Sequence, residues 1–178
     1  GREAFVKLAL GDTDARVQAG KPVAPSYLLA AMLWHDVLGR WRQGREAGNP
    51  PTPALQQAVD QVFEARIGDI SGRGKLAGDM REIWMMQPRF ERRSGNGPFT
   101  LVQQPRFRAG LDFLHLRERA GEAVEGLWTW WDEFALAGEE RRAEMIASAR
   151  SLDSARSAPR KARTRKSSTG SASATDPR

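Results

Sequence analysis

Two aspartates near the start of the chain, Asp12 and Asp14, have the spacing of a metal-binding carboxylate pair. In nucleotidyl transfer, two such carboxylates hold magnesium against the phosphates of the nucleotide. That chemistry also requires a rigid strand beneath the pair and a third carboxylate nearby, and the sequence around Gly11–Asp14 offers neither. We therefore expect a turn and helix cap here, and we assign no metal to it.

A second candidate is a glycine-rich segment in which Arg73 and Lys75 alternate with glycines. It is not a P-loop, because the Gly-Lys-Ser/Thr ending is absent and no strand precedes it. Its two cations can still contact a phosphate. Both a phosphate-contacting loop and a plain solvated loop remain open for this segment.

The densest group of candidate residues lies around a predicted tight turn, Ser94-Gly95-Asn96-Gly97-Pro98, with a Pro-Arg-Phe triplet on either side of it. Arginine forks bind phosphate in a bidentate manner, and flanking aromatic rings can stack on unpaired bases for about 1–3 kcal/mol each. The group therefore predicts contact with the phosphates of a nucleic acid. Its members are Arg89, Arg92, Arg93, Arg106 and Arg108.

Helical spacing limits which of these side chains are free. Phe107 shares a helix face with Leu111 and Leu114, so we expect it in the core rather than as a platform for bases. Arg108 shares another face with Asp112, and an ion pair at this spacing contributes only about 0.2–0.5 kcal/mol. On that same face we place His115, as a solvated or paired surface residue, and Arg119.

The remaining arginines differ in their expected freedom. Arg106 projects away from the face of Arg108 and is expected to be freer. Arg92 and Arg93 lie beside the turn and are expected to be the most available for phosphate contact.

The tryptophans are expected to be mainly structural. Four lie on apolar helix faces. Trp41 is expected at the end of its helix, and Trp130 lies outside the apolar face of the helix predicted over 124–134, so we expect these two to be partly exposed. The four on apolar faces are Trp34, Trp84, Trp128 and Trp131.

Composition excludes several classes of site. The 178 residues include no cysteine, which rules out disulfides, thiolate metal sites and cysteine nucleophiles. The chain has two histidines, His35 and His115, too few for a histidine-based zinc site.

The net charge of +6 is unevenly distributed. Residues 150–178 hold eight basic and two acidic residues, and the rest of the chain holds equal numbers of each. A basic tail on a neutral domain is typical of a protein with a polyanionic partner. That partner is RNA, DNA or an acidic protein, and the tail residues expected to contact it are Arg160, Lys161, Arg163, Arg165 and Lys166.

Apolar residues recur with the helical period, and proline and glycine mark the breaks. The longest unbroken apolar run is far shorter than the roughly 20 residues of a membrane span. The sequence starts at Gly1 without a signal peptide, so we expect a cytoplasmic piece of a longer protein. The predicted helices cover residues 3–10, 25–41, 52–67 (with Thr52 as N-cap before Pro53), 76–88, 99–102, 105–120, 124–134 and 139–152.

These elements predict an all-α fold, an irregular helical bundle or array with a disordered basic C-terminal tail. We divide the chain into a helical body segment over residues 1–75, an arginine-rich helical region over 76–152 and the tail over 153–178.

Several motifs, in order along the chain, resemble the bacterial poly(A) polymerases. The strongest are IWMMQPRFERRSG at 83–95 and QPRFRAGLDFL at 104–114. The second departs from the family pattern P-R/K-F-R-A-A-Y-D at Gly110 and Leu111. FVKLAL at 5–10, PSYLLAAMLW at 25–34 and WWDEF at 130–134 also match.

This resemblance implies the helical, RNA-gripping C-terminal part of an enzyme that adds adenylate from ATP to RNA 3′ ends. The catalytic head and its magnesium-binding carboxylates lie upstream in the family, so we expect no catalytic residue, metal or cofactor in this chain. ATP and Mg²⁺ are implied for the parent enzyme. The implied partners are single-stranded RNA 3′ ends and RNA-decay proteins such as a helicase. A protein-interaction module, or the body of a related CCA-adding enzyme, is the alternative.

Overall fold

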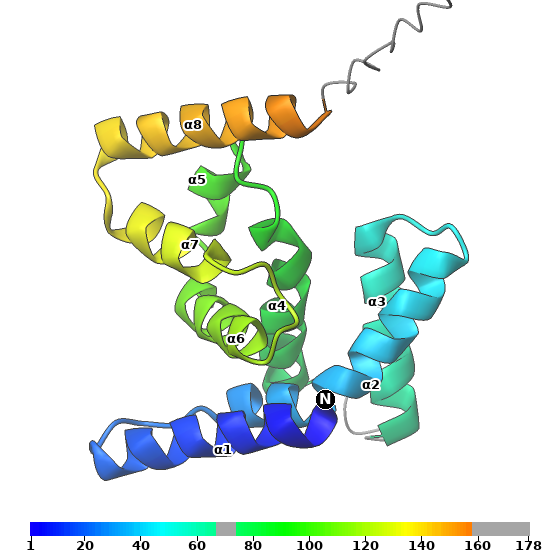
Figure 1. Ribbon diagram of the computed structural model, residues 1–178. Coiled ribbons are helices and arrows are strands. Elements are labelled where there is room, and N and C mark those ends of the chain that lie inside the picture. The colour runs from blue at the N-terminus through cyan, green and yellow to red at the C-terminus, as the bar shows by residue number, and fades with distance from the viewer. Residues whose placement is uncertain (67–73, 158–178) are drawn as a thin grey trace, which may run out of the picture.

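The computed structural model describes residues 1–66 and 74–157. This part of the chain contains eight α-helices and no strand, which confirms the predicted all-α class. In Figure 1, α1 crosses the foot of the molecule and α8 its head, with α4 standing between them and the α2–α3 pair to one side. The helices are α1 (Arg2–Gln18), α2 (Pro25–Glu46), α3 (Pro51–Arg66), α4 (Lys75–Phe90), α5 (Gly97–Leu101), α6 (Phe107–Arg119), α7 (Leu127–Leu136) and α8 (Glu139–Ser157).

One hydrophobic cluster joins α1, α2 and α3 to the first part of α4 and one face of α6. Its centre is Trp34, whose ring meets that of Phe113 edge to face at 5.4 Å between centroids. Trp84 is fully buried in the same cluster and donates a hydrogen bond from Nε1 to the carbonyl of Ala30 at 3.2 Å. The predicted α3 stripe is confirmed at Leu55 and its buried partners Val59, Val62 and Phe63; Ile67 lies outside the described residues.

A second cluster joins the end of α4 to α5, the other face of α6, α7 and one face of α8. Phe90, Trp131 and Phe134 are fully buried in it. Trp131 donates from Nε1 to the carbonyl of Phe90 at 2.7 Å, so the last residue of α4 is held by a buried indole. Helices α4 and α6 supply side chains to both clusters.

Several buried or partly buried polar groups connect α2, α4 and α6 through hydrogen bonds. Glu122, in the connection after α6, accepts a hydrogen bond from Trp34 Nε1 at 2.9 Å and pairs through its other oxygen with His35 Nε2. Arg117 lies over the Trp34 ring and donates to the side chain of buried Gln87 at 3.1 Å. Burial lowers the pKa of the Arg117 guanidinium, and the nearby Glu122 carboxylate opposes that shift.

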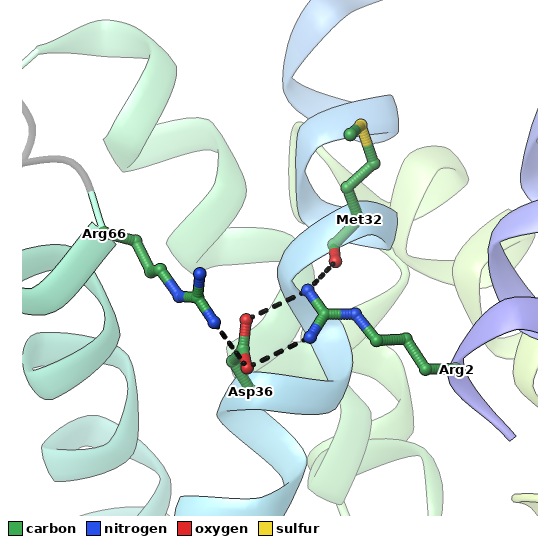
Figure 2. A network of polar contacts seen from close by, with 4 residues as sticks. All are labelled: Arg2, Met32, Asp36 and Arg66. Carbon is green, nitrogen blue, oxygen red and sulfur yellow. Dashed lines mark hydrogen bonds and ion pairs between the residues drawn. The ribbon is translucent and has the colours of Figure 1, made fainter.

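An ion-pair network joins the first residue of α1 and the last residue of α3 to the middle of α2 (Figure 2). Asp36 of α2 accepts from both terminal nitrogens of Arg2 in α1, at 3.3 and 3.2 Å, and from Arg66 of α3 at 3.3 Å. Arg2 also reaches the carbonyl of Met32 at 3.4 Å. Since Asp36 is one-fifth exposed and both arginines are about half exposed, the network orients the helix ends more than it stabilises them.

Several predicted helix boundaries were wrong. Helix α2 continues past Trp41 to Glu46, so Trp41 lies inside the helix and does not end it, and α7 begins at Leu127, three residues later than predicted. Helix α1 continues past Leu10 through the Gly11–Asp14 segment, because its second half pairs with α6 through Asp12 and Arg119. Helix α4 continues through Pro88, because Phe90 is buried and bonded by Trp131. Helix α3 begins at Pro51, so Thr52 lies inside the helix and is not its N-cap.

The C-terminal helix is longer than predicted but packs as weakly as expected. Only Met145 and Ala149 of α8 are buried, and Leu152 is exposed. Residues 153–157, which were predicted to belong to the disordered tail, form the end of this helix. The tail from residue 158 onward lies outside the described residues.

Candidate nucleic-acid interface

Arg89, Arg92 and Arg93, which we call the arginine turn, lie where α4 ends and the chain leads to α5. Arg89 and Arg92 are exposed and Arg93 is half-buried. Within the described part of the chain, none of the three side chains has a hydrogen bond or ion pair. The predicted availability of Arg92 and Arg93 therefore agrees with the geometry, although phosphate contact itself stays a prediction.

The backbone of the arginine turn is well anchored. Phe90 is buried between the arginines, and its carbonyl accepts the indole hydrogen of Trp131. The amide of Arg92 donates to the carbonyl of Arg89 at 3.2 Å. Gly95, with a φ of 76°, supplies the left-handed residue that turns the chain toward α5, as the turn motif predicted. Charged side chains on a fixed backbone lose less freedom when they bind.

Arg106 corrects one prediction, because it is not free. It pairs with Asp79 of α4 at 2.8 Å and lies 3.8 Å from Glu82. Sequence spacing along the helix of Arg106 could not reveal these two acids, since they belong to the neighbouring helix. A phosphate at Arg106 would compete with both carboxylates.

Arg108 is occupied as predicted, and by more than its expected partner. Its Nε lies 3.9 Å from Asp112, one helical turn away. Its terminal nitrogens donate to Asp132 of α7, at 3.2 and 3.3 Å. Arg108 therefore joins α6 to α7 rather than extending the arginine turn.

The other predicted RNA contacts do not gather at the arginine turn. Lys75 is exposed, but it lies at the opposite end of α4, about 21 Å from Arg89 at roughly 1.5 Å per residue. Arg73 lies outside the described residues, as do the tail residues Arg160, Lys161, Arg163, Arg165 and Lys166.

The Asp12–Asp14 pair does not fit a magnesium site. Both residues lie in α1, and Asp12 is bonded through both carboxylate oxygens to Arg119 of α6. Thr13 between them donates to the carbonyl of Ala9 at 3.0 Å. Among the described residues, no group of three or more His, Asp or Glu side chains could hold a metal ion. The expected turn at this segment was wrong, because the acids are part of a helix face.

That helix face forms one wall of a cavity of about 440 Å³, which we call the α1–α6 cavity. The opposite wall is the α6 face that carries Arg108, Asp112 and His115, grouped correctly from their spacing. The cavity was not predicted, because the first helix was expected to end at Leu10, before Asp12 and Arg16. Its lining residues are Asp12, Thr13, Ala15, Arg16, Val23, Ala24, Tyr27, Arg108, Ala109, Asp112 and His115.

Some polar side chains of the α1–α6 cavity have contacts within the protein, and others have no hydrogen-bond partner among the described residues. Arg16 donates from Nε and Nη2 to the carbonyl of Pro22, and the His115 ring stacks on Trp128 at 4.0 Å. In the described structure, neither the Asp112 carboxylate nor the Tyr27 hydroxyl has a hydrogen bond. Burial raises the pKa of Asp112 above its ordinary value of 3.8 and likewise raises the pKa of Tyr27.

Replacing Asp112 by asparagine is expected to stabilise the protein at neutral pH. The raised pKa means that folded Asp112 holds its proton more tightly than the unfolded chain does. The free energy of unfolding therefore falls as pH rises through the folded pKa, and asparagine does not incur this loss. Urea denaturation should give a higher free energy of unfolding for Asp112→Asn than for the unchanged chain at pH 7. This difference should disappear below pH 3.8, the ordinary pKa of the carboxyl group. Neutralising exposed Asp14 is the matched control, and an equal gain there would contradict the assignment.

The aromatic residues follow the prediction. Phe107 is 7% exposed and packs in the second cluster, which confirms it as a core residue. Trp41 and Trp130 are half-buried, as expected, and Trp130 stacks on Phe134 at 5.1 Å. No helix in the described ranges combines the length and hydropathy needed to cross a membrane.

Comparison with known proteins gives a consistent result. Residues 47–167 match the family described as polymerase A arginine-rich C-terminus. Poly(A) polymerase I of Escherichia coli O6:H1 is 30% identical over 148 residues, which cover 81% of this chain and 32% of that protein. The Salmonella typhi and Haemophilus influenzae enzymes of the same name are 30% and 29% identical over 147 residues, with the same coverage. The chain thus spans about a third of the length of these relatives.

Proposed function

Because this chain belongs to the bacterial poly(A) polymerase family, in its arginine-rich C-terminal region, we propose that it is the RNA-binding part of such an enzyme. The family membership expected from the sequence motifs is confirmed. The proposed activity of the parent protein is the addition of adenylate from ATP to RNA 3′ ends. The proposed role of this chain is to hold the RNA strand.

The observation that carries the proposal is the contrast between the arginine turn and the arginines around it. Arg106, Arg108 and Arg119 are each paired with acids of another helix. In the described residues, the arginine turn has no such partner and is held on an anchored backbone. Arginines that the protein leaves unpaired are the ones able to form bidentate contacts with phosphate without first breaking an ion pair.

We place the chemistry itself outside this chain. The resemblance assigns ATP and Mg²⁺ to an upstream nucleotidyltransferase head, and in this chain Asp12 is already committed to Arg119. The basic tail is a further proposed contact for RNA, RNA-decay proteins such as a helicase are the proposed protein partners, and the cytoplasm is the proposed location. Each of these assignments follows from the family rather than from contacts in the structure.

Converting Arg89, Arg92 and Arg93 together to glutamine is expected to weaken binding of single-stranded RNA. Each arginine that neutralises a phosphate contributes about 0.7 to the slope of log affinity against log salt, so the slope should fall by about 2. Affinity at low salt should fall roughly 10- to 100-fold. Fluorescence anisotropy with a labelled RNA oligonucleotide across a salt series measures both, with circular dichroism to check the fold.

Two comparisons make this test specific. Removing three positive charges from α2, with Arg40, Arg42 and Arg45 changed to glutamine, should leave most of the salt slope in place. An equal loss in both triple variants would mean diffuse attraction instead of a site. A chain that ends at Ser157 should keep measurable RNA affinity. If all affinity disappears with the tail, the helical part is a scaffold and the chain is better described as a protein-interaction module.

A further inference from the structure

The α1–α6 cavity combines apolar walls with polar groups that the protein leaves unsatisfied. Ala15, Val23, Ala24 and Ala109 supply apolar surface. The Asp112 carboxylate has Arg108 only at ion-pair distance, because the terminal nitrogens of Arg108 are bonded to Asp132. The Asp112 side chain is 42% exposed, so its carboxylate is open to a ligand that enters the cavity and donates hydrogen bonds.

We propose that the α1–α6 cavity binds one nucleoside 5′-phosphate unit, whose base enters the cavity and donates hydrogen bonds from its amino group to Asp112. The proposal rests on the proposed RNA-binding function and adds to it a site away from the arginine turn. It identifies Asp112 and Tyr27 as binding residues.

The size and walls of the cavity suit a nucleotide. Its volume of about 440 Å³ lies in the range of small-ligand sites, which are mostly apolar with a few placed polar groups. Tyr27 and His115 bring rings to the lining, and both rings are fixed from behind. Phe113 meets the Tyr27 ring edge to face at 6.0 Å, and Trp128 stacks on His115. Rings already held in place can contact a flat base with little loss of freedom.

The charges of the lining determine which end of the nucleotide enters. The lining carries two acids, Asp12 and Asp112, which disfavour a phosphate beside them but do not oppose a base. It also carries two cations, Arg16 and Arg108, which favour a phosphate. Arg16 uses two of its nitrogens on the Pro22 carbonyl, which leaves Nη1 able to donate. The phosphate is therefore placed beside Arg16, outside the acidic part of the cavity.

The same chemistry predicts a base preference. Adenine, guanine and cytosine each carry an exocyclic amino group that can donate to Asp112. Uracil instead carries carbonyl oxygens on either side of its ring N–H, and a carboxylate repels these. The Tyr27 hydroxyl can donate to or accept from a neighbouring ring position. Uridine monophosphate should therefore be the weakest ligand of the four.

The test is a titration of the chain with AMP, GMP, CMP and UMP, followed by protein NMR and calorimetry. We expect saturable binding of AMP, GMP and CMP at one site, weakened about 10- to 100-fold by Asp112→Asn and less by Tyr27→Phe. Asp14→Asn, which removes the same charge from α1 outside the cavity, should bind normally. Equal binding of UMP, or unchanged affinity in Asp112→Asn, would overturn the proposal.

Competition separates the two sources of the nucleotide unit. If an RNA oligonucleotide displaces the bound monophosphate from the wild-type chain, the cavity binds a residue of the RNA strand. If the monophosphate stays bound while RNA binds, the cavity is a site for free nucleotide. Monophosphates that fail to bind, while RNA affinity still depends on the arginine turn, would refute the cavity site and leave the proposed function standing. Monophosphates that bind as expected, while RNA affinity does not depend on the arginine turn, would refute the proposed role of the arginine turn and leave the cavity site standing.

Discussion

Replacing Trp131 by alanine is expected to lower the free energy of unfolding by about 3–5 kcal/mol. The side chain is fully buried at the centre of the second cluster, with Phe90, Phe107 and Phe134 around its ring. Its removal leaves a cavity that the surrounding rings cannot fill. It also leaves the carbonyl of Phe90 without its donor, at the point where α4 leads into the arginine turn.

Urea denaturation followed by circular dichroism measures this effect, and two variants divide it into parts. Trp131→Phe keeps a ring in place but removes the N–H donor, so it should cost about 1–3 kcal/mol. Trp130→Ala removes an indole of the same size from the next position, which is half-buried, and should cost no more than about 2 kcal/mol. Equal losses at Trp130 and Trp131 would contradict the central place given to Trp131.

Replacing Glu122 by alanine is the second substitution with a large expected effect, about 2–4 kcal/mol. One carboxylate satisfies two side chains of α2, Trp34 Nε1 and His35 Nε2, from a connection 87 residues or more away in sequence. Without it the indole donor of Trp34 is buried with no acceptor. The buried Arg117 guanidinium also loses a countercharge, and its pKa is expected to fall further.

Chemical denaturation monitored by tryptophan fluorescence measures the loss, with two comparisons. Glu122→Gln keeps one acceptor oxygen and should recover part of the stability, since an amide can serve only one of the two donors in the same way. Glu125→Ala removes an exposed acid from the same connection and should change stability by less than about 0.5 kcal/mol. A cost for Glu122→Ala no greater than that for Glu125→Ala would show that the two bonds contribute nothing.

Periodicity predicted the helices and their buried faces well, because packing follows the apolar stripe directly. Leu55, Val59 and Val62 are buried as their spacing indicates. Met80, Ile83 and Trp84 are buried too, whereas Leu76, predicted on the same α4 stripe, is exposed. The face shared by Arg108, Asp112 and His115 was also grouped correctly, and it became a wall of the cavity.

The contacts between residues of different helices could not be predicted from the sequence. Arg106 looked free because Asp79 and Glu82 lie on another helix, 27 and 24 residues earlier in the chain. Helix α1 looked short because glycine and two aspartates disfavour helix locally, while the pairing of Asp12 with Arg119 lies 107 residues away. Local propensity sets the expected ends of helices, and tertiary contacts move them.

The two clusters share α4, and this sharing has a consequence for how freely the sequence can change. A substitution in α3 or α8 alters the fit against one set of neighbours, because each of these helices contributes to a single cluster. A substitution in α4 must remain compatible with both, since Trp84 lies in one cluster and Phe90, six residues later, in the other. Helix α4, like α6, therefore has a narrower choice of tolerated side chains than α3 or α8, and the arginine turn at the end of α4 is held in a fixed position.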